Sequence, residues 1–488
     1  MRFFHKIKRA RLQKIKKAVD KNDKITYIKR QRVGGEVLLS KFKVSNFLSF
    51  DDEQVFSMEA GKVRSHIGRI CVDNNTKLLK FMAIYGANAS GKSNLVSAFN
   101  FAQMVIIEGI PTRTYGYYCK LNKENKMKAS HFEFTIILDH HKYVYGFDVV
   151  ISNGSFVSEY LKLIKYGNTY KTIFSRNVLS GEYVVDEYFK NATINERLKI
   201  YIEDIKSDSS ILFLRMMNQN KESLYEAEPE IIIYKRIFNW IKYNLSVNYP
   251  DRPITNYSYL IDGSGVEQVG KLLSAFGTGV AEFAVADIPL EKATIKIPKE
   301  IMEDIIENLT EQQKRYKKHG VQKIPAIMLR SAEDNSMFII QLMDGNVQCK
   351  TLEFRHQATD AIFSIDEESD GTIRLLDLIE VLLSEDTEKV YIIDEINRRF
   401  HPLLTYKFVE EYLKLATERN IQLIVTTHES KLMDFDLLRK DEIGFVDKDE
   451  EGKSTIFSLD SFGERFDKKV YKAYLSGAYG AIPKFSLK

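Results

Sequence analysis

Residues 80–100 read KFMAIYGANASGKSNLVSAFN, an apolar run that leads into a glycine-rich turn and then into an amphipathic stretch. Such a turn needs a buried strand before it and a helix after it, and residues 81–85 and 93–108 have those patterns. Glycines let backbone N–H groups turn towards an anion, and the positive end of the helix faces the same point. The stretch therefore predicts a phosphate-binding loop. It fits the pattern G-x-x-x-x-G-K-S through Gly86, Gly91, Lys92 and Ser93.

The loop residues have distinct expected roles. Lys92 is expected to reach the β- and γ-phosphates of a nucleoside triphosphate, and the Ser93 hydroxyl is expected to hold Mg²⁺. The predicted cofactors are therefore ATP and Mg²⁺. The residues expected to cradle the phosphates are Gly86, Ala87, Asn88, Ala89, Ser90, Gly91, Lys92, Ser93 and Asn94.

The composition indicates a soluble globular protein of several domains. The chain has 488 residues, of which 44% are hydrophobic and 28% charged, so two or three domains are expected. Three cysteines are scattered without C-x-x-C spacing, which argues against a disulfide framework or a zinc site. No apolar run approaches the roughly 20 residues of a membrane span, and the amino terminus lacks a signal-peptide core. A cytoplasmic protein that does not bind membranes is predicted.

The positive charge is concentrated at the amino terminus. Residues 1–33 contain 13 Lys or Arg against two Asp, so this arm carries +11 while the rest of the chain carries −7. The run from residue 3 to residue 19 has the periodicity of a helix with one apolar side. Two interpretations stay open: contact with nucleic acid or another acidic partner through residues 1–33, or a solubilising arm.

The pattern along the chain predicts four parts. Residues 1–37 are the basic arm, and residues 38–190 are an N-terminal lobe with a hairpin, the phosphate loop and an antiparallel sheet. Residues 191–322 have helical periodicity without a sustained heptad, which indicates a compact helical insertion instead of a long coiled coil. Residues 323–488 return to strands and form the C-terminal lobe, with a hairpin turn at Asp344-Gly345-Asn346.

Two later strands end in chemically useful side chains. Residues 388–395 read EKVYIIDE, and there Asp394 is expected to hold Mg²⁺ through water while Glu395 acts as general base on the attacking water. Residues 421–429 read IQLIVTTHE, which places His428 where it could reach the γ-phosphate or the water. The predicted catalytic residues are Glu395, His428 and Lys92, and the predicted metal ligands are Ser93 and Asp394. Alternatively, residues 388–395 are only a strand that leaves the core, and His428 only caps the end of a strand.

Residues 367–376 read EESDGTIRLL and precede the carboxylate strand by one helix. Ser369 and Asp370 can cap a helix that begins near Thr372, and Gly371 permits close approach of an anion. This is either an ordinary helix cap or a second phosphate-binding element made of these four residues.

The ordered set NFLSF, GANASGKS, ESDGT, IIDE and TTH resembles the ABC-type ATPases of the SMC and OLD kind, over residues 38–100 and 350–485. The resemblance implies an α/β ATPase head, with a mixed sheet that carries the phosphate loop, an antiparallel β subdomain and a compact helical insertion. It implies that Lys92, Ser93, Asp394, Glu395 and His428 act within one subunit. Ser369 and Gly371 would complete the site of a second subunit, which predicts a homo-oligomer, and Asn397 and Arg398 would lie in the loop that crosses between subunits.

Two departures from that family pattern are evident. The signature SDGT is poorer in glycine than usual, and no glutamine loop can be placed, with Glu133 the nearest candidate. One Mg²⁺ or water contact is therefore unassigned.

Within this family the chain looks most like bacterial ATPases of phage-defence and abortive-infection loci, of the RloA and PARIS AriA type. The motifs behind this are YGANASGKSNL, ESDGT, DEINRRFHP, DEIGFVDKD and the closing LSGAYGAIP. The resemblance implies an ATP-dependent switch that controls a separately encoded effector, often a nuclease, with a phage protein as trigger.

Two other functions are weighed against this switch. One is an OLD-type nuclease in a single chain, for which the acidic residues Glu442, Asp447, Asp449 and Glu450 are candidates; the same residues are also typical of a solvated hairpin turn. The other is an SMC-like DNA-repair or chromosome ATPase that grips DNA through residues 1–33.

Overall fold

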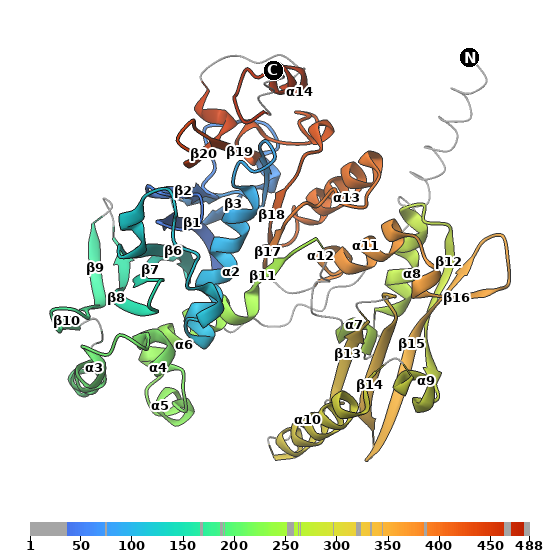
Figure 1. Cartoon of the computed structure of the whole chain (residues 1–488), viewed down its shortest axis with the longest axis horizontal. Helices are drawn as coiled ribbons and strands as arrows, with labels where there is room; N and C mark the ends of the chain where they lie inside the picture. Colours follow the sequence, from blue (N-terminus) through green and yellow to red (C-terminus); the bar gives the residue numbers. More distant parts are fainter. Residues whose placement is uncertain are drawn as a thin grey trace. The chain divides into compact units, whose positions relative to one another are not determined.

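The computed structural model describes residues 37–482, except 74–75, 166–168, 186–188, 190, 251–257, 262, 264, 296, 319–323, 332–333, 344, 385–387 and 463–469. The predicted basic arm at 1–33, Asp344 of the predicted hairpin turn and Pro483 of the closing motif lie outside the described residues. The chain divides into two compact units (Figure 1). We call residues 35–255 with 380–488 the phosphate-loop unit and residues 256–379 the second unit, and each is described by itself.

The phosphate loop follows a strand in a six-stranded, mostly parallel sheet. Its order is β11-β17-β18-β5-β19-β20, and only β20 runs antiparallel to its neighbour. All five residues of β5 are buried, as an apolar run at the centre of a parallel sheet requires. The three apolar runs singled out in the sequence are therefore neighbouring strands. The bounds are β5 Phe81–Tyr85, β11 Leu245–Asn248, β17 Val390–Ile393, β18 Gln422–Thr426, β19 Ile443–Lys448 and β20 Ser454–Ser458.

A seven-stranded antiparallel sheet forms the other half of this unit, in the order β10-β9-β8-β7-β6-β1-β2. It contains the predicted hairpin as β1 and β2 and the predicted antiparallel strands as β6 to β8. With the mixed sheet, it confirms the predicted α/β class. The bounds are β1 Val37–Ser45, β2 Gln54–Ser57, β6 Ser130–Leu138, β7 His141–Val150, β8 Ser155–Ile164, β9 Tyr170–Asn177 and β10 Glu182–Val185, with a small pair β3 Cys71–Asp73 and β4 Thr76–Leu78 apart from it.

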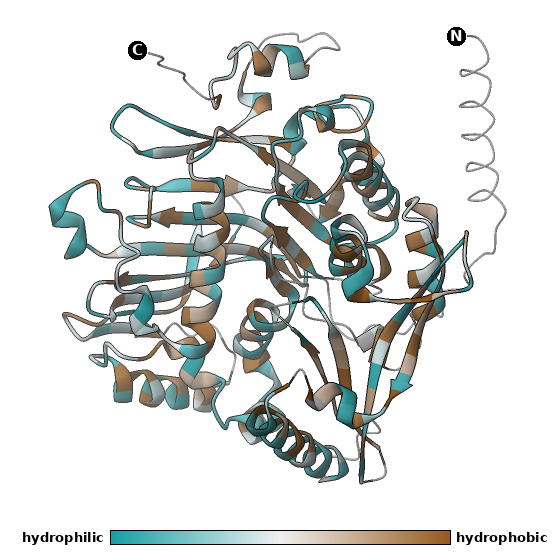
Figure 2. Ribbon diagram, turned by 45° about the vertical axis from the view of Figure 1, so that its right-hand side comes forward, coloured by the Kyte–Doolittle hydropathy of each residue, from teal (hydrophilic) through white to brown (hydrophobic). Residues whose placement is uncertain are grey.

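Helix α2, Lys92–Glu108, lies between the two sheets (Figure 1). Its buried residues include Phe99, whose ring stacks on Phe42 of β1 with ring centres 3.9 Å apart. The same core contains Val390 and Ile424 of the parallel sheet. Hydrophobic residues are concentrated along the strands and the helix faces turned to them (Figure 2). Apolar residues of α2 pack against both sheets, and this packing fixes the position of its first turn, where the phosphate loop ends.

Helices between β10 and β11 pack onto the antiparallel sheet and belong to the phosphate-loop unit. They are α3 Ala192–Ile205, α4 Phe213–Met217, α5 Glu222–Ala227 and α6 Ile232–Asn239, and the turn Trp240–Asn244 leads from α6 into β11. The remaining helices of this unit are α12 Glu380–Leu383, α13 Pro402–Leu415 and α14 Val470–Leu475, with short 3₁₀ turns at Ile67–Arg69, Thr112–Thr114, Lys123–Lys126, Pro229–Ile231, Ser430–Leu432, Lys440–Glu442 and Leu459–Ser461.

The second unit is built on a five-stranded antiparallel sheet, in the order β12-β15-β14-β13 with β16 paired to β15. Helix α10 packs on this sheet through a small apolar core that includes Ile305, Leu309 and Ile340. The strands are β12 Val280–Ile288, β13 Ala326–Arg330, β14 Met337–Met343, β15 Asn346–His356 and β16 Ile362–Ser364; the helices are α7 Ser258–Ile261, α8 Val266–Ala275, α9 Leu290–Thr294, α10 Lys299–Lys318 and α11 Asp370–Leu378, with a 3₁₀ turn at Ile365–Glu367.

The predicted helical insertion at 191–322 does not form a separate body. Its first part, α3 to α6, packs in the phosphate-loop unit, whereas α8 to α10 belong to the second unit. The stretch also contributes two strands, β11 and β12. The helical periodicity of apolar residues indicated which residues face a hydrophobic core. It could not indicate which of the two cores they join, because that depends on contacts between residues far apart in the sequence.

A buried ion pair ties helices α3 and α4 to the antiparallel sheet. Arg176 of β9 and Glu159 of β8 have fully buried side chains, and Nε of Arg176 lies 3.2 Å from a carboxylate oxygen of Glu159. Glu159 also accepts hydrogen bonds from Tyr145 and from the backbone of Phe213 and Leu214. The remaining guanidinium N–H groups donate to the carbonyls of Ile205, Asp208 and Ile211.

Replacing Arg176 by Met is expected to destabilise the protein by about 3–5 kcal/mol, because it leaves the Glu159 carboxylate buried without its cation. Lys206→Met removes a surface pair with Glu203, whose side chain is 57% exposed, and should change stability by less than about 1 kcal/mol. Urea unfolding of both variants measures the difference. Equal losses in the two variants would contradict this role for Arg176.

Candidate functional site

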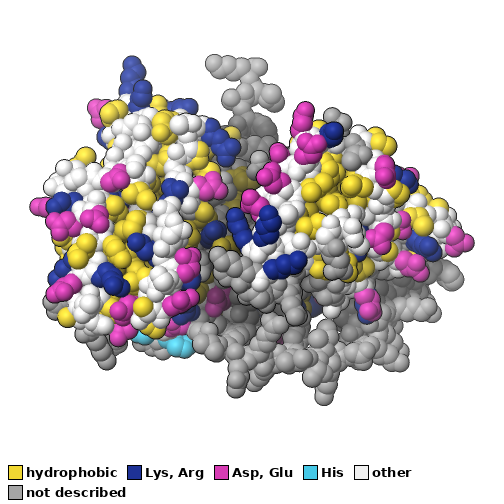
Figure 3. Space-filling model, turned by 90° about the horizontal axis from the view of Figure 1, so that it is seen from below, with side chains coloured by type: hydrophobic (Ala, Val, Ile, Leu, Met, Phe, Trp, Pro, Cys, Tyr) yellow, Lys and Arg dark blue, Asp and Glu magenta, His cyan; other side chains and the backbone are white. Residues whose placement is uncertain are grey.

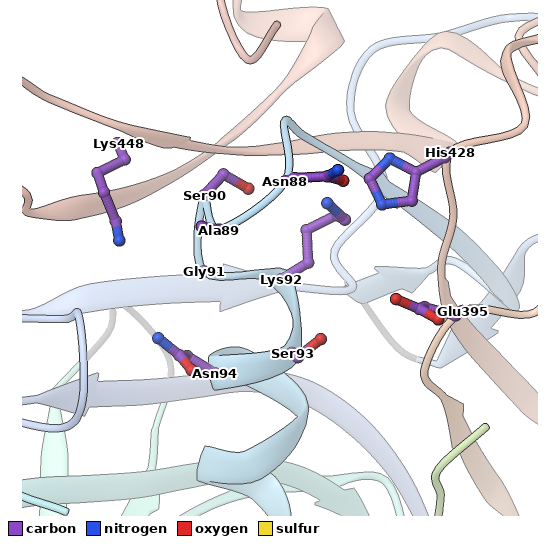
Figure 4. Close-up of a pocket in the computed structure, with 10 residues that line it drawn as sticks. All are labelled: Asn88, Ala89, Ser90, Gly91, Lys92, Ser93, Asn94, Glu395, His428 and Lys448. Atoms are coloured by element: carbon purple, nitrogen blue, oxygen red, sulfur yellow. The ribbon is translucent and has the colours of Figure 1, made fainter. Parts of the chain in front are cut away.

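A cavity of about 490 Å³ opens at the carboxyl ends of β5, β18 and β19 (Figure 4). It brings the predicted loop residues together with Glu395 and His428, which come from two other strands. In parallel sheets, ligands bind at this edge of the strands. The cavity is lined by Asn88, Ala89, Ser90, Gly91, Lys92, Ser93, Asn94, Glu395, His428 and Lys448.

Close approaches of neighbouring atoms require both glycines of the loop, and Gly91 is also required by its backbone conformation. Gly91 has φ of 115°, and a Cβ there would lie 2.5 Å from the Ser454 hydroxyl. A Cβ on Gly86 would lie 2.3 Å from the carbonyl oxygen of Val446. Both obstacles come from the β19–β20 hairpin, some 360 residues away in sequence. Gly91 also precedes the first turn of α2, whose N–H groups have no acceptor within the helix and face the anion.

Side chains from two distant segments, together with Asn94 of α2, brace the loop. The Ser454 hydroxyl of β20 donates to the carbonyl of Ser90 at 2.6 Å and lies 2.7 Å from the Ser49 hydroxyl. Asn94 of α2 donates its side-chain amide to Ser49 at 2.7 Å. These hydrogen bonds join the loop, helix α2, the NFLSF turn and β20. The NFLSF segment predicted as a hairpin therefore also positions the phosphate loop.

Lys92 is held by the loop itself. Its ammonium donates to the carbonyls of Gly86 and Ala87, at 2.7 and 2.9 Å. Burial lowers the pKa of Lys92 to about 8, although the negative charges of Asp394 and Glu395 oppose the shift. An anion that enters the cavity would stabilise the charged form of this buried ammonium group.

Asp394 and Glu395 are fixed by the neighbouring strand. Thr426 at the end of β18 donates its hydroxyl to Asp394 at 2.6 Å, and the same oxygen accepts from the backbone N–H of Glu395 at 2.8 Å. The backbone N–H of Asp394 donates to Asn248 of β11. Glu395 adopts φ of 48°, which turns its side chain into the cavity, and Arg398 lies 3.8 Å from it. Asp394 is buried and acts on Lys92 through its charge, without lining the cavity.

The predicted Mg²⁺ ligands match the chemistry of that ion. Mg²⁺ prefers hard oxygen ligands from one or two protein groups together with phosphate and water. The Ser93 hydroxyl lines the cavity, and the Asp394 carboxylate is kept in place by Thr426. Ser93 therefore fits a direct ligand, and Asp394, which is buried and does not line the cavity, fits a contact made through a water.

His428 lies at the opening of the cavity, with its ring exposed to solvent on one side. Partial burial lowers the pKa of His428, and the positive charge of Lys92 acts in the same direction while Asp394 opposes it. The imidazole is therefore mainly neutral near pH 7. Asn397 holds this strand end, since its side-chain oxygen accepts from the Thr427 hydroxyl and from the backbone N–H of His428.

The predicted signature residues belong to the second unit. The Ser369 hydroxyl accepts from the backbone N–H of Thr372 at 3.1 Å and caps helix α11, whose first residues are Asp370 and Gly371. The capping interpretation is confirmed. The phosphate-binding interpretation of these four residues stays a prediction.

Other sequence candidates lie outside the cavity. Glu133 accepts a hydrogen bond from Tyr160 and pairs with Lys43 within the antiparallel sheet. Glu442 is buried and accepts from the backbone N–H of Arg439. Burial raises the pKa of Glu442 to about 7. Within the described parts of the chain, no three His, Cys, Asp or Glu side chains are grouped to hold a metal ion.

A second cavity, of about 320 Å³, shares Asn94 and Lys448 with the first. Sequence reasoning missed this cavity and missed Lys448, Ser49, Ser454 and Thr426. Lys448 could have been found, because it ends an apolar strand of the same sheet, as Asp394 and His428 do. The serine and threonine hydroxyls carry no signal of their own in the sequence. The cavity is lined by Leu48, Ser49, Asn94, Tyr118, Lys120, Leu121, Lys448 and Gly452.

Comparison with known families gives one match. A family described as "AAA domain, putative AbiEii toxin, Type IV TA system" matches residues 81–166 and 275–434, which together make up just over half of the chain. No curated protein matches the sequence.

Among solved structures, SMC head domains resemble this chain. One is a head bound to the C-terminal winged-helix domain of ScpA, with 16% identity, coverage of 87% of this chain and 98% of that chain, and a TM-score of 0.37. A second is a Pyrococcus furiosus complex of an Smc head with the C-terminal domain of ScpA, with 14% identity, coverage of 87% and 97%, and a TM-score of 0.36. A third is the SMC head of Thermotoga maritima, with 11% identity, coverage of 86% and 98%, and a TM-score of 0.33.

The affinity for ATP is expected to fall as the pH rises above about 8. The pKa of Lys92 is about 8 in this structure, and bound phosphate favours the charged ammonium, so binding takes up a proton above that pH. Each further pH unit should weaken binding by up to about tenfold.

Titration calorimetry at pH 7 and pH 9, in buffers of different ionisation enthalpy, measures this proton uptake. Lys92→Arg is the control, since a guanidinium stays charged over the whole range. Equal heats in all buffers at pH 9 would rule out the predicted linkage.

Proposed function

Because the chain belongs to the AAA-domain family described as putative AbiEii toxin of type IV toxin-antitoxin systems, we propose that it is an ATPase that binds ATP with Mg²⁺ and hydrolyses it. The observation that carries the proposal is the single cavity in which Lys92, Ser93, Glu395 and His428 meet. No helix among the described residues is long and apolar enough to cross a membrane.

Binding begins with an exchange of partners at Lys92. Its ammonium leaves the carbonyls of Gly86 and Ala87 and turns to the phosphates, whose negative charge replaces two neutral acceptors. The first N–H groups of α2 face the same anion. Ser93, and Asp394 through a water, are the residues that would hold Mg²⁺, and the ion would offset negative charge on the phosphates. The nucleoside then lies towards Asn94, where the second cavity begins.

Hydrolysis uses the opposite side of the cavity. Glu395 accepts a proton from the water that attacks the γ-phosphate, in the manner of a general base. The Thr426 hydroxyl positions both acidic residues, because it accepts from the backbone N–H of Glu395 and donates to the carboxylate of Asp394. His428, mainly neutral, donates or accepts one hydrogen bond at the γ-phosphate or the water, and Asn397 fixes the backbone that carries it.

We further propose that the site is completed by a second copy of the chain. Ser369 caps α11, a helix of nine residues that begins with Asp370, Gly371 and Thr372 and belongs to the second unit. A helix start with a serine and a glycine can donate N–H groups to a γ-phosphate. On this proposal, the chain forms a homo-oligomer when it binds ATP.

The biological role that we propose is anti-phage defence. The family description names a putative AbiEii toxin and a type IV TA system, which fits the resemblance of the motifs to ATPases of the RloA and PARIS AriA type. In this role the cytoplasmic ATPase controls a separately encoded effector such as a nuclease, and a phage protein is the trigger. Affinity purification of the Glu395→Gln variant from infected cells tests which proteins bind.

The two alternatives have less support. A DNA-repair ATPase depends on residues 1–33, which lie outside the described residues. On the face seen in Figure 3, the basic and acidic side chains of the described residues are interspersed. An OLD-type nuclease needs a metal site, and the candidate acidic residues include the buried Glu442.

Glu395→Gln is expected to bind ATP with unchanged affinity and to hydrolyse it about 10²–10⁴ times more slowly, because an amide cannot accept the proton. Glu418→Gln, an exposed carboxylate beyond helix α13, is the matched control. Steady-state phosphate release measures the rates. A Glu395→Gln variant as fast as the parent would remove Glu395 as the base.

Mixing two inactive variants tests whether the site is shared. Lys92→Met and Ser369→Arg should each be inactive alone, since each spoils every site of its own homodimer. A one-to-one mixture should recover about a quarter of the parent activity, because half of the randomly formed dimers contain one intact site. Activity of Ser369→Arg alone at the parent rate would mean that the site is complete within one chain.

A further inference from the structure

The second cavity lies where the nucleoside of a bound nucleotide would extend. It shares two lining residues with the phosphate cavity, Asn94 and Lys448, so a ligand can occupy both at once. In Figure 4, Lys448 and Asn94 lie on the side of the loop away from Glu395 and His428. With the γ-phosphate at Glu395, the sugar and base are directed to Lys448.

The walls of this cavity suit a flat ring and carry cationic donors without a carboxylate acceptor. Leu48, Tyr118 and Leu121 offer apolar and aromatic surface for stacking, which every base accepts. The polar side chains include two lysines and no carboxylate. The side-chain amide of Asn94 donates a hydrogen bond to the Ser49 hydroxyl. Among these lining residues, the side-chain carbonyl oxygen of Asn94 is the one amide acceptor.

Lys448 is the cation best placed to contact the base. It ends strand β19, is half buried, and forms no ion pair with the described residues. Its neighbour Lys453 pairs with Asp51 and Asp52 and lines neither cavity. A half-buried ammonium without a carboxylate is stabilised by a ligand that supplies acceptor atoms.

Lysine donors distinguish the two purines. Guanine presents two adjacent acceptors, O6 and N7, whereas adenine presents N7 beside the N6 amino donor, which an ammonium repels. We propose that the second cavity binds the purine base with Lys448 at its O6/N7 edge, so that the site takes GTP at least as well as ATP. This inference deepens the proposed nucleotide hydrolysis and rests on it.

Binding measurements on the full chain with Glu395→Gln, which prevents turnover, test the proposal. Calorimetry with Mg²⁺ and ATP, GTP or tripolyphosphate should give a GTP affinity equal to that for ATP or tighter. Lys448→Met should weaken GTP binding by about tenfold and leave ATP and tripolyphosphate nearly unchanged. Lys448→Arg should retain GTP, since a guanidinium also donates to O6 and N7.

Lys126→Met is the matched control, because Lys126 is an exposed lysine of the loop that carries Lys120 but lines neither cavity. Thermal unfolding confirms that each variant folds. ATP binding about tenfold tighter than GTP in the parent, or an equal loss of both nucleotides in Lys448→Met, would overturn the inference. The second result would place Lys448 on a phosphate instead.

The controls separate this inference from the proposed function. Binding of ATP and tripolyphosphate without GTP would leave the phosphate site intact and refute the base assignment alone. If ATP, GTP and tripolyphosphate all failed to bind, the proposed function would fall, and the base assignment with it.

Discussion

The close approach of the β19–β20 hairpin to the phosphate loop is the constraint on which this site depends. Gly91 has no room for a side chain because Ser454 lies against it, and the Ser454 hydroxyl also binds the carbonyl of Ser90. Ser49 of the NFLSF turn and Asn94 of α2 complete the brace. A loop that presents backbone N–H groups to an anion must be rigid before the anion arrives, since reorganisation would cost binding energy.

The carboxyl edge of the parallel sheet accounts for the rest of the chemistry. Strands β5, β17, β18 and β19 run parallel, so the side chains that follow them meet at one edge although they are up to 360 residues apart. Between β17 and β18 the Thr426 hydroxyl links Asp394 to Glu395. Gln422 joins this sheet to the antiparallel one, because its amide binds the backbone of Leu39 and Leu79.

The electrostatics of this site favour the binding of a polyanion. Lys92 is buried with a pKa near 8 and rests on two backbone carbonyls. Lys448 stands on the other side of the loop without an acidic partner among the described residues. Two cations that are incompletely neutralised by protein groups favour a ligand that brings negative charge and acceptor atoms.

The sequence by itself determined the α/β class, the phosphate loop, the Asp-Glu strand and the position of His428. These features are local: a glycine pattern, an apolar run of four or five residues and the polar residues directly after it. Only the tertiary structure decided which distant hydroxyls brace the loop, because Ser49, Ser454 and Thr426 are common residue types without a pattern. It also decided that residues 191–322 join two different cores, and that Lys448 opens a second cavity, since both depend on contacts between segments far apart in the chain.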